Sequence, residues 1–186
     1  MYIITTGGKI TECFNGNEFK CKCGCNEIHI DKEFVQRMQK LHEKLQTLPK
    51  GCKAVYINSG YRCAKQSQKI KGAFIGDMHN IGAAADFHAQ YKDGTYIDAV
   101  TLCEAAQLVG FGGIAVIDEF NAHVDDRQRG DINYTNKQWY GNESTGENYT
   151  TFIGKSKHTH DLNKKSNQIY IEIMIDDHKY SGLLDG

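Results

Sequence analysis

The sequence has little proline, no long apolar run and no excess of charge of one sign. Of its 186 residues only Pro49 is a proline, which excludes a Pro-rich linker or ligand segment. The longest aliphatic run covers residues 113–117, whereas a membrane span needs roughly 20 apolar residues, so we expect no membrane insertion. Lys and Arg total 22 against 23 Asp and Glu, a net charge of −1. This balance argues against a strongly electrostatic nucleic-acid binder, and we expect no nucleic-acid partner.

A secretory signal is also missing from the first residues. They show no basic segment followed by an apolar stretch of about 7–15 residues, so we expect synthesis in the cytoplasm without a signal peptide. Cysteine, in contrast, is abundant, with seven residues. In a reducing compartment, thiols or metal ligands are more common than structural disulfides.

Three of the cysteines, Cys21, Cys23 and Cys25, occupy alternate positions. They could form a structural zinc site with one of the others, but alternate residues of an extended chain point in opposite directions. Ordinary reduced thiols packed as small hydrophobes are the simpler interpretation. Disulfides formed in an oxidising exterior are a third one. The other cysteines considered for such a site are Cys13, Cys52 and Cys63.

Hydrophobic spacing predicts two amphipathic helices. The first covers residues 34–48, with Asp31 as its N-cap and Pro49 beyond its end. The second covers residues 98–109 and is ended by Gly110. We expect a short helix within residues 64–70, strands over residues 54–58 and 83–88, and a hairpin formed by residues 114–117 and 122–125.

The length of the chain favours one domain. After Tyr140 the composition shifts to polar residues, so we expect a main domain over residues 1–140. Residues 141–186 are expected to form a polar linker followed by a hairpin over residues 168–184, where isoleucines alternate with other residues. This segment is either an extension of the same domain or a very small module.

Two segments carry residues of metal chemistry. His79 lies seven residues before Asp86, with Gly82 and three alanines between them, and His123 is followed two residues later by Asp125. Two imidazoles and a carboxylate suit Zn²⁺ and leave a fourth position for water. The side chains of His123 and Asp125 leave the same face of a strand, so Asp125 is either a base beside the metal or a partner that orients a ligand. The structural alternative is that both histidines are satisfied polar residues near loops.

These motifs resemble those of the zinc D-Ala-D-Ala carboxypeptidases and related phage peptidoglycan endopeptidases. The family pattern SxHxxGxAxD is similar to residues 77–86 (DMHNIGAAAD), and its later His-x-Asp segment to residues 122–125 (AHVD). Further likenesses are FKCKCGC at residues 19–25, INSGYRC at residues 57–63 and GFGGI at residues 110–114. The resemblance covers roughly residues 12–140, with the motifs in the expected order.

The resemblance implies that His79, Asp86 and His123 hold zinc and that Arg62 faces the substrate. A guanidinium there could stabilise the developing oxyanion or bind a carboxylate; the alternative for this arginine is a structural ion pair. The implied fold is α+β, with a small antiparallel sheet that carries the zinc site and two main helices packed on it. The implied activity is hydrolysis of the stem peptide of bacterial peptidoglycan, as a D-Ala-D-Ala carboxypeptidase or an L-Ala-D-Glu endopeptidase. We expect a monomer, and the missing signal peptide favours a phage or prophage lysin that acts on the cell wall.

The chain departs from the family pattern at three places. Asp77 replaces the usual Ser, residues 66–68 replace a common Asn, and Phe120 stands where many relatives carry an acid. The catalytic base therefore does not transfer from the resemblance. Strand geometry favours Asp125 for this role, with Glu119 as the rival. These departures keep an alternative open, a non-catalytic, zinc-stabilised module that binds the cell wall or belongs to a phage particle.

Overall fold

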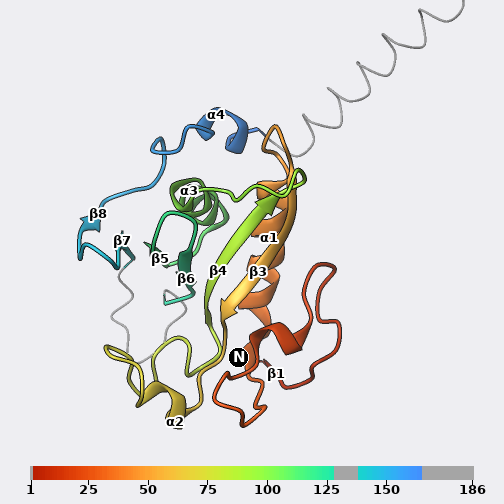
Figure 1. Cartoon of the computed structure of the whole chain (residues 1–186), viewed down its shortest axis with the longest axis vertical. Coiled ribbons are helices and arrows are strands. Elements are labelled where there is room, and N and C mark those ends of the chain that lie inside the picture. The colour runs from red at the N-terminus through yellow and green to blue at the C-terminus, as the bar shows by residue number, and fades with distance from the viewer. Residues whose placement is uncertain (1, 128–137, 165–186) are drawn as a thin grey trace, which may run out of the picture.

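Two main helices pack on one face of a six-stranded sheet (Figure 1). The computed structural model describes residues 2–127 and 138–164, and the hairpin predicted over residues 168–184 lies outside them. The architecture is α+β, as predicted. Within these described ranges, no helix is both long and apolar enough to cross a membrane. In chain order the elements are β1 (Ile3–Ile4), the 3-10 helix η1 (Gly16–Phe19), β2 (Ile30–Asp31), α1 (Lys32–Leu45), β3 (Cys52–Ser59), α2 (Ala64–Ser67), β4 (Ala84–Tyr91), α3 (Ala99–Val109), β5 (Gly113–Val116), β6 (Ala122–Asp125), β7 (Trp139–Asn142), β8 (Asn148–Tyr149) and α4 (Thr159–Leu162).

The strands of the large sheet follow the order β3-β4-β6-β5-β7-β8. The predicted hairpin is β5 and β6, and one parallel pair, β5 with β7, is added to the expected antiparallel sheet. Gly113 pairs with both Asp125 and Trp139, so the chain leaves β6 and enters β7 at the same end of the sheet. A strand that returns from this end on the far side of β5 must run parallel to β5.

Local signals define both main helices. The Asp31 side chain caps α1 by accepting a hydrogen bond from the Phe34 N–H at 3.0 Å. Asp98 caps α3 in the same way, with a bond of 3.0 Å from the Thr101 N–H. Gly110, with φ +89°, ends α3 in the left-handed conformation that glycine favours. Both helices lie within a residue or two of their predicted starts, and α1 buries its apolar stripe.

Alternation along β4 and β6 separates the core from the opposite face of the sheet. Phe87 on β4 and Val124 on β6 are fully buried among the residues of the core. Their strand neighbours Asp86, His123 and Asp125 point to the other face, because successive side chains of a strand alternate. The apolar half of each strand therefore packs on the helices and leaves the polar half for chemistry.

The described chain after β7 packs on the same core. Phe152 and Leu162 are buried, and β8 pairs with β7. The buried carboxylate of Glu104 in α3 accepts hydrogen bonds of 2.9 Å from the backbone N–H groups of Gly154 and Ser156. We therefore propose that residues 141–164 are an extension of the main domain, which is one of the two possibilities that the composition left open.

Candidate metal centre

Two of the predicted ligands, Asp86 and His123, are cross-strand partners on β4 and β6. Directly opposed residues of an antiparallel pair share a face and lie close together. The Nδ1 atom of His123 is 2.8 Å from Asp86 Oδ1, and both side chains are more than four-fifths buried. The pairing of two strands that are distant in sequence thus brings an imidazole and a carboxylate into contact.

The third predicted ligand, His79, lies in the turn that precedes β4. Asp77 holds this turn, since its Oδ1 accepts a hydrogen bond of 2.8 Å from the Asn80 N–H. Asp and Ser are both favoured at such capping positions, so the replacement of the usual Ser by Asp77 leaves the turn capped. The Nε2 atom of His79 lies 3.3 Å from Asp86 Oδ1. The turn therefore brings the second imidazole to the same carboxylate oxygen.

Gly82 sets the path of the chain between His79 and Asp86. Its φ is +80°, and a Cβ atom added there would overlap the backbone carbonyl of His29. Its own carbonyl accepts a hydrogen bond of 2.9 Å from the Asp31 N–H. Only glycine combines this backbone conformation with so close an approach, which explains the glycine between the two ligands.

Each candidate imidazole uses its other nitrogen to bond to the protein. The Nδ1 atom of His79 lies 2.7 Å from the Gly60 carbonyl oxygen, and Nε2 of His123 lies 3.1 Å from Asp125 Oδ2. The tautomers assigned from these acceptors put an N–H on each of those atoms. Nε2 of His79 and Nδ1 of His123 are then left facing Asp86. Metal-binding histidines are usually oriented by such a bond from their second nitrogen.

The donor set fits zinc. His79, Asp86 and His123 each offer one ligand atom, and these three atoms lie within 4.8 Å of one another. Two imidazole nitrogens and one carboxylate oxygen are a common ligand set of catalytic zinc sites, which keep a further position open. Here the three ligands line a cavity, which leaves room for such a position.

Charge is concentrated at this site in the metal-free protein. Burial opposes ionisation of Asp86, but hydrogen bonds from His123 and His79 outweigh it and lower the pKa of this carboxyl well below its usual range. Burial likewise favours the neutral form of His123, yet its hydrogen bonds with Asp125 and Asp86 raise its pKa to about 10. A cation is therefore stabilised between the two carboxylates, and a bound metal would replace the proton of His123.

Asp125 is fully buried and occupied by hydrogen bonds. Its Oδ1 accepts hydrogen bonds from the backbone N–H of Arg127 at 3.0 Å and from the Nε of Arg127 at 2.9 Å, and its Oδ2 faces Nε2 of His123. Burial raises its pKa, but the bonds with His123 and Arg127 lower it by more. The carboxylate is thus ionised and held on the far side of His123 from Asp86. This placement helps to distinguish the two roles considered for Asp125, a base beside the metal or a partner that orients a ligand.

Arg62 lies beside the candidate metal ligands. Its Nη2 atom donates to Asp86 Oδ2 at 2.6 Å, and its Nε donates to Ser59 Oγ at 3.1 Å. The Asn80 side chain fixes the same segment by donating to the Arg62 carbonyl at 2.8 Å. The arginine therefore makes the ion pair that was its alternative role, and it also lines the cavity described below.

Glu119 lies apart from this group. It is an exposed residue in the turn between β5 and β6, where its carbonyl accepts a hydrogen bond of 2.9 Å from the Ala99 N–H. It is not among the described residues that line the cavity. The structure thus brings His79, Asp86, His123, Asp125 and Arg62 together but leaves Glu119 out.

A cavity of about 500 Å³ opens beside the three ligands. Its wall includes three residues that no sequence motif marked as functional, namely Arg127, Trp139 and Glu143. Arg127 lies over the Trp139 ring, with 5.2 Å between its guanidinium carbon and the ring centroid. Among the described acidic residues of the wall, only Glu143 is exposed. Its place depends on the pairing of β7 with β5, a contact that no local pattern signals.

The comparison with known proteins identifies a family. Residues 12–125, well over half of the chain, match the family described as Peptidase M15, which is of the zinc D-Ala-D-Ala carboxypeptidase type. The match includes all three candidate ligands and confirms the resemblance that the motifs indicated. No curated protein and no solved structure matches the chain.

Proposed function

The chain belongs to the peptidase M15 family, and we propose that it is a zinc peptidase that hydrolyses the stem peptide of bacterial peptidoglycan. The observation that carries the proposal is the convergence of His79, Asp86 and His123 in the wall of a cavity that could accept a peptide. The bond cleaved would be that of a D-Ala-D-Ala carboxypeptidase or of an L-Ala-D-Glu endopeptidase. A role as a phage or prophage lysin, like the monomeric state, stays a prediction from the sequence.

We propose that His79 Nε2, Asp86 Oδ1 and His123 Nδ1 hold the zinc ion. When bound, zinc supplies Lewis-acid chemistry, because it polarises a carbonyl group and lowers the pKa of water. The Gly60 carbonyl keeps His79 in the required orientation, and Asp125 does the same for His123. These contacts favour a rigid site whose ligands need little rearrangement.

Of the two roles considered for Asp125, we propose the orienting one. A general base must reach the proton that it removes, whereas this carboxylate is fully buried and held by Arg127. Its low pKa also makes it a weak base. Its contact with His123 instead supports a role in fixing the ring and its tautomer.

We propose Glu143 as the general base. It is exposed, lines the cavity and extends β7, whose Gly141 lies in the same cross-strand row as Ala115 and His123. A carboxylate at this place could accept a proton from an attacking water. The matched test is Glu143→Gln against Glu119→Gln, an exposed acid outside the cavity. We expect kcat to fall about 10²–10⁴-fold in the first variant only, the usual contribution of a general base, with zinc content unchanged in both.

Arg62 is proposed to have two roles. Its bond with Asp86 orients a metal ligand, and its place in the cavity wall supports contact with the oxyanion or with a carboxylate of the substrate. Arginine suits both, because its planar group offers several N–H donors in a fixed arrangement.

Purified peptidoglycan tests the activity directly. The full chain, loaded with zinc, is incubated with it, with and without a chelator, and the products are identified by mass. Release of D-Ala would indicate the carboxypeptidase, and new D-Glu amino termini would indicate the endopeptidase. We expect either product to vanish on chelation and in His79→Ala. Binding to peptidoglycan without products would refute the enzyme and support the non-catalytic module that the departures from the family pattern left open.

A further inference from the structure

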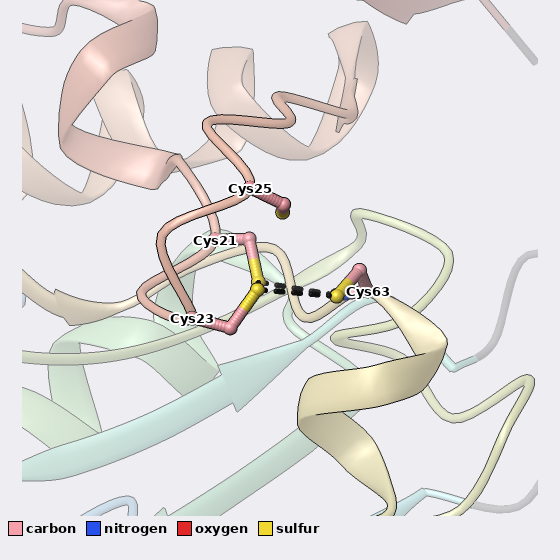
Figure 2. A group of neighbouring side chains, drawn as sticks. All are labelled: Cys21, Cys23, Cys25 and Cys63. Atoms are coloured by element: carbon pink, nitrogen blue, oxygen red, sulfur yellow. Dashed lines mark hydrogen bonds between the residues drawn. The ribbon is translucent and has the colours of Figure 1, made fainter.

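Four of the seven cysteines gather at a second place, away from the His79 site. Cys21, Cys23 and Cys25 come from the loop between η1 and β2, and Cys63 is the N-cap residue of α2. Figure 2 shows the sulfur atoms of Cys21, Cys23 and Cys63 directed toward one another. The Sγ atom of Cys23 lies 3.5 Å from that of Cys21 and 3.5 Å from that of Cys63. All four sulfur atoms lie within 4.8 Å of one another.

The backbone of the loop explains how alternate cysteines converge. Gly24 has φ +89° and Asn26 has φ +62°, so the chain turns repeatedly instead of running extended. The Cys21 N–H donates to the Glu27 carbonyl at 2.9 Å and closes the loop. The objection that alternate residues point in opposite directions applies to an extended chain, and this segment is a turn. Glycine at the first of these positions carries no steric cost.

We propose that Cys21, Cys23, Cys25 and Cys63 form a structural zinc site. Zinc with four thiolates is tetrahedral with Zn–S bonds of about 2.3 Å, which places the sulfur atoms about 3.8 Å apart. Two of the sulfur–sulfur distances here are 3.5 Å and all lie within 4.8 Å, so small shifts would reach that value. Four protein ligands leave no open position, and a closed set is typical of structural zinc, in contrast to the three-ligand site.

A backbone N–H group also bonds to the cluster. The Cys63 N–H donates to Cys21 Sγ at 3.4 Å. Such a bond stabilises a thiolate and orients it, as outer contacts do at metal sites.

The proposed site would hold the segment that carries Arg62. Cys63 follows Arg62 directly, and the Tyr61 N–H donates to the Phe19 carbonyl at 2.8 Å. Gly60 packs so closely on Phe19 that a Cβ atom there would lie 2.6 Å from its Cα. A metal that joins the loop to Cys63 would add metal–sulfur bonds to this contact between Gly60 and Phe19. The N-terminal loop would then support the wall of the candidate active site without touching its substrate.

Metal content tests the proposal independently of catalysis. Full-length chain purified under reducing conditions should hold two zinc ions, and His79→Ala should hold one. Cys25→Ser should also hold one and keep it at the other site. Cys13→Ser is the matched control, since Cys13 is exposed with its Sγ 3.1 Å from His42 Nδ1, and it should hold two. Cobalt in place of zinc should give thiolate-to-cobalt charge-transfer bands in the near ultraviolet, in the unmodified chain and in His79→Ala.

Three results would overturn the proposal. One is a chain that holds a single zinc ion which His79→Ala removes. Another is cobalt-loaded protein without the thiolate bands, a measurement that needs no cysteine variant and so does not depend on how well Cys25→Ser folds. The third is a disulfide among the four cysteines in the reduced preparation, seen as a loss of two hydrogen masses. If instead the thiolate site fills and the His79 site does not, the proposed peptidase fails and this proposal stands.

Discussion

Replacing Asp125 by Asn removes a buried negative charge from behind His123 while keeping the shape of the side chain. In the structure the carboxylate accepts from Nε2 of His123 at 3.1 Å and pairs with the guanidinium of Arg127. The Asn oxygen can still accept the bond from His123, but the NH2 group on the other side cannot accept from Arg127. The His123 ring keeps its position, but it loses the neighbouring negative charge that makes its nitrogen a stronger metal ligand.

The expected magnitude follows from these contacts. Loss of a partner that orients a metal-bound histidine typically weakens metal affinity about 10–100-fold, which is about 1.4–2.7 kcal/mol. Breaking a buried ion pair costs about 3–5 kcal/mol of stability. The Arg127 side chain is 18% exposed and can regain water, so we expect the lower end of that range. With zinc in excess, kcat should fall by less than about tenfold, because a base is not being removed.

Zinc affinity is measured by competition with a chelator, kcat at saturating zinc, and unfolding by heat. Asp126→Asn is the control, because Asp126 is the next residue and its buried carboxylate pairs with Arg37 at 2.9 Å. This control should lose stability and keep its zinc affinity. If Asp125→Asn binds zinc normally while kcat drops about 10²–10⁴-fold, Asp125 is the base and the orienting role is wrong.

Three further predictions concern other parts of the site. Arg62→Lys should lose about 2–4 kcal/mol in kcat/KM, as for a lost oxyanion donor; a change confined to KM would indicate binding of a substrate carboxylate instead. Because the pKa of His123 is raised to about 10 in the metal-free chain, zinc affinity measured by chelator competition should rise about tenfold per pH unit up to that pH. The same proton should stabilise the metal-free fold fully below about pH 6.5 and be lost toward pH 10, which urea unfolding measures; a flat profile contradicts the assignment. Gly82→Ala should lower the free energy of unfolding by more than the about 1–2 kcal/mol that a left-handed residue costs, because its Cβ also meets the His29 carbonyl. Gly94→Ala, where φ is +86° and the space is open, should lower it by only that amount. Thermal unfolding measures both variants.

The helices and the ligand-bearing strands were predictable because their signals are local. Apolar spacing, an aspartate N-cap and Gly110 define the ends of α3 within a few residues. The alternation of apolar and polar residues in β4 predicts that Phe87 and Asp86 point to opposite faces, and this needs no information about the partner strand. The ligand set was suggested by spacing and by the resemblance, since Gly82 and its neighbours leave a recognisable pattern around His79.

Other features depend on contacts that a local pattern does not encode. The pairing of β7 with β5 places Trp139 and Glu143 at the cavity, and their own sequence context is polar and irregular. The convergence of the four cysteines does not follow from their alternate spacing, because alternate residues of an extended chain point in opposite directions. Gly24 between the second and third cysteine was the available sign of a turn, while the contribution of Cys63 required the fold itself.

The two ligand clusters occupy consecutive stretches of the chain. One closes the segment between Cys21 and Cys63, the other the segment between His79 and His123, and neither segment contains a part of the other. Each segment spans about forty residues. The entropic free-energy cost of closing the two loops is therefore nearly equal, on the order of 3 kcal/mol apart from a constant. On a ribosome all four thiols emerge before His123 does. The four cysteines could therefore meet while the second segment is still being synthesised, so assembly of the two sites needs no threading of one through the other.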